Sequence, residues 1–407
     1  MKFTAFDRKH FARLADGLAV VLAVSLPWST SATGILTGFW LLAIIPTLDL
    51  PSLRRVIFVP AGGIPVLFVT IGALGVLWAN VAWAERFDGV ESFLKLLCIP
   101  LFFHQFFRSD GGRRVLIAFL ASCVLLLAVS WLLLAWPEMP WPGNVRSPGV
   151  PVKDYISQGA MFTVCVLVIA QFAYDSWQDG HRRLALALVM LALVFLVNVF
   201  FAATSRTSLV VIPILLTVFG YRVFGWKGAI GLVVGGFVLA GAVWPSAPFL
   251  RQRVISFFDE VSSYQPSAKS TPAGERLEFW RKSVEFIQEA PLIGHGTGSI
   301  REQFRRSAVG QTGMAALASA NPHNQIFAVG IQIGLVGIAG LLAMWIAHLA
   351  LFRSGSFAAW VGLVVTIQNI ISSLFNSHLF DFTHGWAYVV GVGIAGGIVL
   401  KESIARP

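Results

Sequence analysis

Long apolar runs separated by short polar breaks extend along nearly the whole chain. A helix of about 20 apolar residues crosses the hydrocarbon core of a bilayer, and most of the runs approach this length. The pattern predicts helices near residues 14–29, 31–48, 60–79, 91–107, 115–135, 156–173, 184–203, 207–220, 228–245, 323–347, 357–375 and 386–400. About twelve spans place both termini on the same side of the membrane.

Composition supports this interpretation. Apolar residues make up 56% of the chain and charged residues only 12%, whereas soluble proteins carry about 25% charged residues. We therefore expect an all-α polytopic membrane protein. The formal net charge of +10 suits anionic substrates, but basic cytoplasmic loops make many membrane proteins cationic, so charge alone identifies no substrate.

The basic residues of the short loops predict the orientation of the chain, because short cytoplasmic loops are enriched in Lys and Arg. They fall on the side of the basic N-terminus: Arg54, Arg55, Arg108, Arg113, Arg114, Arg182, Arg183, Arg222, Lys227, Arg353, Lys401 and Arg406. We expect this side to be the cytoplasm. The long hydrophilic segment 246–322 then forms a periplasmic cap between the helical regions 1–245 and 323–407.

One helix of the cap has clear end signals. Thr271 and Pro272 are typical of a helix N-cap and first residue, and Ala290-Pro291 predicts the end about 18 residues later. An apolar stripe recurs at helical spacing, formed by Leu277, Trp280, Val284 and Ile287. Charged residues are expected on the other faces, namely Glu278, Lys282, Glu285 and Glu289. Arg276 lies at the rim of the stripe, where it can reach an anionic headgroup.

Two further segments carry candidate chemistry at the same membrane surface. The sequence Asn321-Pro322-His323-Asn324 places a titratable histidine directly before an apolar helix. Arg206 lies in a polar break among Ser and Thr residues. Its guanidinium either captures a phosphate with the help of neighbouring hydroxyls or is simply solvated among headgroups.

A metal site is not expected. Four polar residues crowd the last periplasmic loop: Asn376, His378, Asp381 and His384. Their spacing fits neither a zinc motif nor an EF-hand. We therefore predict no metal ligands in this chain.

A family resemblance rests on these residues. His323-Asn324, followed after nine residues by Gly334-Leu335-Val336-Gly337, resembles the signature of bacterial O-antigen ligases. Ser205-Arg206, the Arg276–Trp280 helix and Pro291–Gly296 resemble elements of the wider superfamily, which also contains O-antigen polymerases and protein O-oligosaccharyltransferases. The resemblance covers about half of the chain.

The resemblance implies a GT-C-like membrane glycosyltransferase of the bacterial inner membrane with a periplasmic active site. The donor would be O-antigen on undecaprenyl pyrophosphate and the acceptor a sugar hydroxyl of lipid A-core, with membrane lipids but no nucleic acid as further partners and no cofactor. His323 would be the base. Arg206 and Arg276 would stabilise the leaving pyrophosphate in an inverting, metal-independent transfer, and we expect the three side chains to line one cavity.

Two residues have less defined roles. Asn324 would orient His323 or the acceptor, and Asp381 would hold the imidazole or a sugar hydroxyl. Three other functions remain open. An O-antigen polymerase or a protein O-oligosaccharyltransferase would use the same donor chemistry. A lipid-linked oligosaccharide flippase would predict ionisable residues at the bilayer midplane, whereas the candidate residues here gather at one surface.

Overall fold

The computed structural model describes residues 5–141, 147–203, 205–243, 245, 248–266 and 270–405, which form helices and turns and contain no strand. The α-helices are α1 Ala5–Ser25, α2 Thr30–Ile44, α3 Leu50–Ile57, α4 Pro60–Leu74, α5 Trp83–Leu94, α6 Cys98–Arg108, α7 Gly112–Ala135, α8 Tyr155–Gln178, α9 Arg182–Phe201, α10 Arg206–Val243, α11 Pro248–Ser262, α12 Pro272–Glu289, α13 Ile300–Ala308, α14 Gln325–Leu351, α15 Phe357–Ser372 and α16 Phe382–Ala405.

The predicted class of fold is confirmed. Within the described ranges, nine helical segments are long and apolar enough to cross a membrane, and α15 is a shorter apolar helix. Two expected helices, 207–220 and 228–245, form the single element α10, which is broken at Gly225 (φ 67°, ψ −160°). The helix expected at 14–29 is α1, which begins earlier, at Ala5, and is not among the nine because its first half carries several charges.

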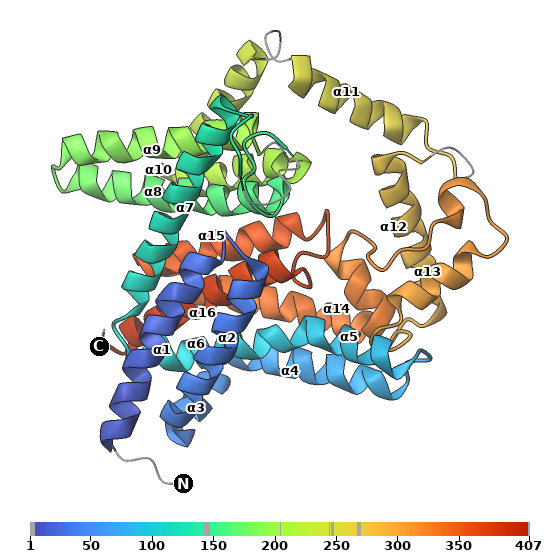
Figure 1. Ribbon diagram of the computed structural model, residues 1–407, viewed down its shortest axis with the longest axis horizontal. Coiled ribbons are helices and arrows are strands. Elements are labelled where there is room, and N and C mark those ends of the chain that lie inside the picture. The colour runs from blue at the N-terminus through green and yellow to red at the C-terminus, as the bar shows by residue number, and fades with distance from the viewer. Residues whose placement is uncertain are drawn as a thin grey trace.

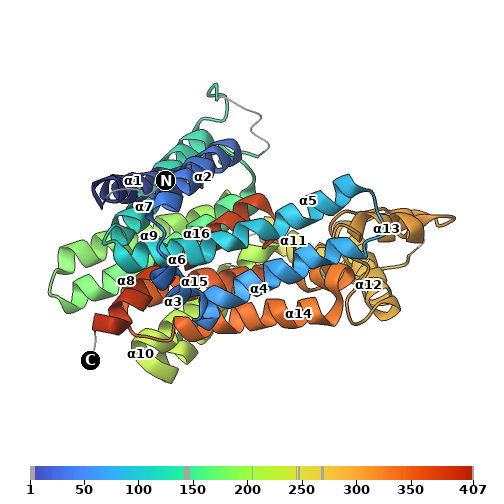
Figure 2. The ribbon, with the colours of Figure 1, turned by 90° about the horizontal axis from the view of Figure 1, so that it is seen from below.

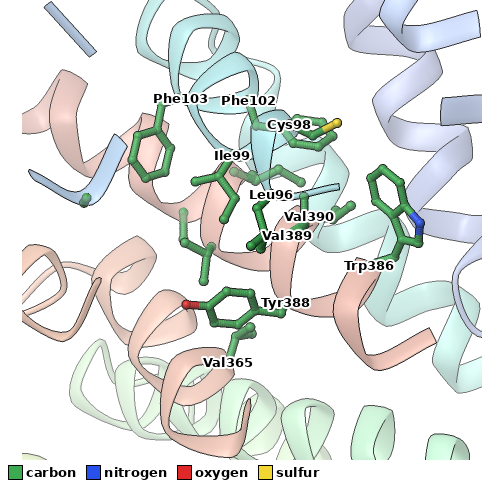
Figure 3. Close-up of a cluster of buried hydrophobic side chains, with 14 of the residues drawn as sticks. Leu96, Cys98, Ile99, Phe102, Phe103, Val365, Trp386, Tyr388, Val389 and Val390 are labelled. Atoms are coloured by element: carbon green, nitrogen blue, oxygen red, sulfur yellow. The ribbon is translucent and has the colours of Figure 1, made fainter. Parts of the chain in front are cut away.

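The membrane core is held together by close contacts between helices. Figure 3 shows Phe102 and Phe103 of α6 beside residues of α16. A Cβ added at Gly393 or Gly396 of α16 would come within 2.6 Å of Phe102 or 2.2 Å of Phe103. Glycine therefore allows the two helices to approach, which matters in a bilayer because van der Waals packing drives helix association there.

The hydrophilic segment of the chain forms α11, α12 and α13. Both views place α12 and α13 at one end of the long helices α4, α5 and α14 (Figures 1 and 2). The start of α1 and the end of α16 lie toward the opposite end of the molecule (Figure 1). We refer to α11, α12, α13 and their connections as the cap.

The end signals of α12 are confirmed. Thr271 is the N-cap and its side chain accepts a hydrogen bond from the backbone N–H of Gly274, with Pro272 at the first helical position. The helix has 18 residues and its C-cap is Ala290. Trp280 and Ile287 face α14, since the Trp280 ring lies 6.2 Å from that of Phe327 and Ile287 packs against Gly330.

Two charged residues of α12 are buried, although their spacing predicts only that they lie away from the apolar stripe. Glu278 and Lys282, which we expected on the other faces, are 0% and 2% exposed, whereas Val284 of the expected apolar stripe is 42% exposed. Arg281 and Tyr264 donate hydrogen bonds to the Glu278 carboxylate, and Lys282 Nζ donates to the Ala315 carbonyl at 2.6 Å. Such partners make the burial of charge tolerable. Two of them, Tyr264 and Ala315, lie outside the helix, where its periodicity gives no sign of them.

Candidate active site

His323 lies directly before α14 in a backbone conformation that few side chains adopt. Its φ is 54°, in the left-handed region that is uncommon for residues other than glycine. The Oδ1 atom of Asn321 accepts a hydrogen bond from the backbone N–H of His323 at 2.8 Å. This is an Asx turn, which holds the unusual conformation. The local sequence Asn-Pro-His therefore fixes the direction in which the imidazole leaves the backbone.

Asn324 is the N-cap of α14. Its Oδ1 accepts hydrogen bonds from the backbone N–H groups of Ile326 and Phe327 at 2.9 and 3.3 Å, and its Nδ2 donates to the Leu374 carbonyl at 3.1 Å. The side chain is buried. These bonds fasten the start of α14 to the loop between α15 and α16. A direct contact of Asn324 with substrate stays a prediction.

The His323 imidazole is held from two sides. Its Nδ1 lies 3.1 Å from Oδ1 of Asn376, which belongs to the loop between α15 and α16. The Phe279 ring of α12 stacks on the imidazole, with the ring centroids 6.0 Å apart and an angle of 19° between the planes. Asp381 was expected to hold the imidazole or a sugar hydroxyl. The partner of Nδ1 is Asn376, and the role of Asp381 stays a prediction.

Asp381 belongs to a neighbouring cluster. Its Oδ1 accepts a hydrogen bond from the backbone N–H of His384 at 2.9 Å, and its side chain is 44% exposed. Burial lowers the pKa of Lys153 to about 8, while the nearby carboxylates of Asp381 and Asp154 act in the opposite direction. The His378 ring joins this cluster to the site, because its centroid lies 3.9 Å from that of His384.

A cavity of about 70 Å³ lies deeper in the bundle, between α1, α7, α8, α15 and α16. Its polar lining includes His384, Thr383, Ser157 and Gln368. The three residues expected to share a cavity, His323, Arg206 and Arg276, do not line it. Their shared cavity therefore stays a prediction.

The segment that follows α12 of the cap is bound to α14, the helix that begins just after His323, at a break in that helix. Gly334 has φ 61° and ψ −157° and interrupts the helix. The segment that follows α12 docks on this break through four backbone hydrogen bonds of 2.8–3.2 Å, two donated by His295 and Gly296 and two accepted by Pro291 and Leu292. A Cβ at Gly334 would lie 2.4 Å from the Leu292 carbonyl oxygen. Glycine is thus required for the docking that fixes α12 relative to α14.

The docked helix α12 carries Arg276, which is half-buried. Burial and the neighbouring Arg206 guanidinium lower the pKa of Arg276, while Tyr155 and Glu260 oppose this effect. Arg206 is the first residue of α10, and its Nη2 lies 3.6 Å from Oε1 of Glu260. The other Glu260 oxygen accepts a hydrogen bond from the backbone N–H of Ala273 in the first turn of α12 at 2.9 Å. Two like charges therefore interact, and the Glu260 and Glu275 carboxylates oppose their effect on each other.

Arg276 also acts on the histidine. Burial and the Arg276 charge lower the pKa of His323 from its usual 6.5, although the hydrogen bond with Asn376 and the Glu275 carboxylate act in the opposite direction. The imidazole is therefore neutral at neutral pH and able to accept a proton. Arg276 thus lies close enough to both Arg206 and His323 for their charges to interact.

Several helices begin at this site. Tyr155 is the first residue of α8 and Arg206 that of α10, Arg276 lies in the second turn of α12, and His323 lies two residues before α14. Helix N-termini carry partial positive charge. The region is therefore electrostatically suited to an anion such as a phosphate.

Sequence reasoning missed Tyr155 and Glu260 and gave Asn376 no role in the site. Glu260 is one charged residue of an unremarkable amphipathic helix, and no periodicity distinguishes it. Tyr155 could have been found, since Asp154 is a typical N-cap residue and predicts a helix start on the same membrane side as Arg206. Asn376 could only be connected to His323 in three dimensions.

No metal cluster is found in the described ranges. Within them, no group of three or more His, Cys, Asp or Glu side chains is arranged so that it could hold a metal ion. Metal independence of the reaction stays a prediction that a chelator can test.

The fold and the site define a multi-pass helical membrane protein with a neutral histidine and two arginines gathered at one end, next to a helical cap. Residues 191–342 match the family described as O-antigen ligase. This match supports the resemblance found in the sequence, and the matched region contains Arg206, Arg276 and His323. It supports an enzyme of the ligase and polymerase superfamily.

A relative from Haemophilus influenzae is described as an uncharacterized protein. It is 28% identical to this chain over 131 residues, which are 31% of this chain and 31% of the relative. The two proteins are thus similar over about a third of their lengths, and the relative suggests no activity.

Proposed function

We propose that this protein is an O-antigen ligase, which transfers O-antigen glycan from undecaprenyl pyrophosphate to a sugar hydroxyl of lipid A-core during lipopolysaccharide biosynthesis. The observation that supports this function best is the proximity of a neutral His323 to Arg276, itself beside Arg206, inside an O-antigen ligase family domain. This set provides a proton acceptor and two fixed cations at helix N-termini, which is what transfer from a pyrophosphate requires.

In the proposed reaction the acceptor oxygen attacks the anomeric carbon of the donor glycan from the face opposite the pyrophosphate. The new C–O bond forms as the bond from the anomeric carbon to the pyrophosphate oxygen breaks, so the configuration inverts. His323 takes the proton of the acceptor hydroxyl. The electron pair of the broken bond stays on undecaprenyl pyrophosphate, whose added charge Arg206 and Arg276 stabilise.

The placement in the cell is part of the proposal. Basic short loops favour a cytoplasmic location for both termini, which puts the cap (246–322) and the site on the periplasmic side of the inner membrane. Both lipids would then enter the site from the outer leaflet of that membrane. Asp381, on the same side and 44% exposed, is proposed to contact a sugar hydroxyl rather than the imidazole.

A transfer assay tests the function. Purified full-length protein is mixed with undecaprenyl-pyrophosphate O-antigen and either lipid A-core or a second lipid-linked glycan, in the presence of EDTA. We expect product on lipid A-core with the wild type and none with folded His323→Ala. Extension of the lipid-linked glycan alone would identify a polymerase instead. Glycosylation of a periplasmic protein alone would identify an oligosaccharyltransferase, and no product with any acceptor would contradict the proposed chemistry.

A further inference from the structure

Two asparagine side chains connect the histidine segment to the loop between α15 and α16. Asn321 Nδ2 donates a hydrogen bond to Asn376 Oδ1 at 2.8 Å. The same Asn376 oxygen lies 3.1 Å from Nδ1 of His323. In addition, Ser377 Oγ donates to Asn321 Oδ1 at 2.8 Å. One hydroxyl and two amides thus form a chain of hydrogen bonds that ends at the imidazole of the proposed base.

Backbone donors fix the orientation of both amides. The Asn321 oxygen accepts from the backbone N–H of His323 at 2.8 Å, and the Asn376 oxygen accepts from the backbone N–H of Ser377 at 3.0 Å. A backbone N–H only donates, so each of these positions must be the amide oxygen rather than the nitrogen. Rotating either amide by 180° would bring an NH₂ group against a backbone N–H.

The orientation of Asn376 has a direct consequence for His323. A carbonyl oxygen only accepts hydrogen bonds, so the Nδ1 atom opposite it must carry the proton. In a neutral imidazole the other nitrogen, Nε2, then holds the lone pair. The nitrogen available to accept a proton is therefore determined by a chain of hydrogen bonds that begins at two backbone N–H groups.

We propose that Asn321 and Asn376 are positioning residues that hold neutral His323 in the Nδ1–H tautomer and so present Nε2 as the proton acceptor. Asn376 does so directly. Asn321 acts twice, because it donates to the Asn376 oxygen and also holds the backbone of His323 at φ 54°. The tautomer follows from the hydrogen-bond geometry alone, while the catalytic importance of Nε2 rests on the proposed function.

Other groups that act on His323 must be considered in any test. Arg276 and Glu275 face it from α12, and His378 faces it from the loop between α15 and α16. None of them is changed in the variants below. Phe279 covers one face of the ring and carries no charge.

The first experiment measures the tautomer without substrate. The full-length protein is labelled with ¹⁵N-histidine, and the ring nitrogen signals of His323 are assigned by comparison with His323→Gln. We expect Nδ1 protonated and Nε2 unprotonated in neutral wild-type protein. Asn376→Ala should produce a mixture of tautomers or the Nε2–H form. A wild-type protein in the Nε2–H form would overturn the proposal whatever the enzyme transfers.

The second experiment separates positioning from a general structural role. Asn376→Ala should lower kcat by on the order of 10²-fold with little change in KM, since the misdirected base no longer meets the acceptor proton. Asn376→Asp keeps the acceptor toward Nδ1 and adds a negative charge. It should restore much of kcat and move the acid limb of the pH profile to higher pH, because the charge favours imidazolium.

The control is Asn369→Ala, which removes another buried amide, bonded to Trp345 of α14 at 3.2 Å. If Asn369→Ala lowers kcat as much as Asn376→Ala, or if Asn376→Asp leaves the pH profile unchanged, the positioning role is rejected. Inactive wild-type protein with the expected tautomer would instead reject the proposed function and keep the tautomer assignment.

Discussion

His323 and the two arginines belong to the same site, but they are held by opposite kinds of interaction. Hydrogen bonds fix the histidine, one to its backbone and one to Nδ1, and Phe279 stacks on its ring. The arginines repel each other, as the effect of Arg206 on the pKa of Arg276 indicates. Glu260 lies 3.6 Å from Arg206 and partly offsets that repulsion.

We refer to His323 with its partners and to the arginine pair as the two halves of the site. The difference between them indicates what each half requires. A general base must be in the correct tautomer and direction before the acceptor arrives, and a hydrogen-bonded network provides this. Two like charges that repel each other gain more from an arriving dianion than isolated charges do. In the proposed reaction the base would thus be organised in advance, whereas the donor would relieve the repulsion between the arginines.

The largest effect is expected from removing one charge of the arginine pair. Arg206→Gln and Arg276→Gln should each lower kcat by about 10²- to 10³-fold, the typical effect of losing one donor to a developing negative charge. The lysine variants should retain intermediate activity, because they keep the charge but not the planar fork of donors. Initial rates of transfer in vitro measure both effects.

Arg305→Gln is a matched control for this prediction. Arg305 lies on α13 of the cap, and its side chain is 72% exposed and paired with Glu302. It should leave the rate unchanged within about twofold, since surface pairs contribute little. An equal loss in Arg305→Gln would mean that the cap attracts the donor by its overall charge.

The next largest effect should come from separating the two halves. Gly334→Ala places a Cβ where the Leu292 carbonyl lies 2.4 Å away, at a residue with φ 61°. We expect the docking of the segment after α12 to fail, so that Arg276 shifts relative to His323 and kcat falls by on the order of 10²-fold. Gly235→Ala in α10, where nothing lies within 4 Å, should keep full activity. Thermal unfolding of both variants distinguishes a local shift from global unfolding.

The membrane fold was accessible from the sequence because spanning helices depend on a local property, namely a long apolar run. The caps of α12 were accessible for the same reason, since Thr271 and Pro272 act within one helical turn. Gly225 illustrates the limit. Two helices separated by a loop were expected around it. The structure has one element, α10, interrupted only by the backbone conformation of Gly225, which the apolar pattern does not reveal.

Within the site, the sequence was enough to select the candidate base and the candidate cations, but it did not reveal the residues that contact them. His323, Arg206 and Arg276 each stood beside a helix end or at the rim of a helix. Glu260 and Asn376 contribute through contacts between segments that are more than 50 residues apart, such as Asn376 with His323. The burial of Glu278 was missed for a related reason, because Tyr264, one of its partners, lies outside its helix.

A smaller effect should reveal the electrostatic link between the halves. Arg276 lowers the pKa of His323, so Arg276→Gln should raise that pKa, because a nearby positive charge disfavours imidazolium. In the proposed reaction, activity requires neutral imidazole and falls as the pH drops through this pKa, so the acid limb of the pH profile should move to higher pH in the variant. An NMR titration of His323 measures the shift directly. No shift relative to Arg305→Gln would mean that the halves are electrostatically independent.

The smallest effect concerns the carboxylate beside the arginine pair. Glu260→Gln removes the charge that offsets Arg206, while its amide oxygen can still accept the hydrogen bond from the Ala273 N–H. The empty site then becomes more positive, so the donor lipid should bind about two- to fivefold more tightly, as expected for a partly exposed pair. The gain should shrink at high salt, because screening weakens exposed charges. Titration of undecaprenyl pyrophosphate at two ionic strengths measures it. Weaker binding in Glu260→Gln would instead mean that the carboxylate positions the arginines, and the contrast between a fixed base and a strained cation pair would then be lost.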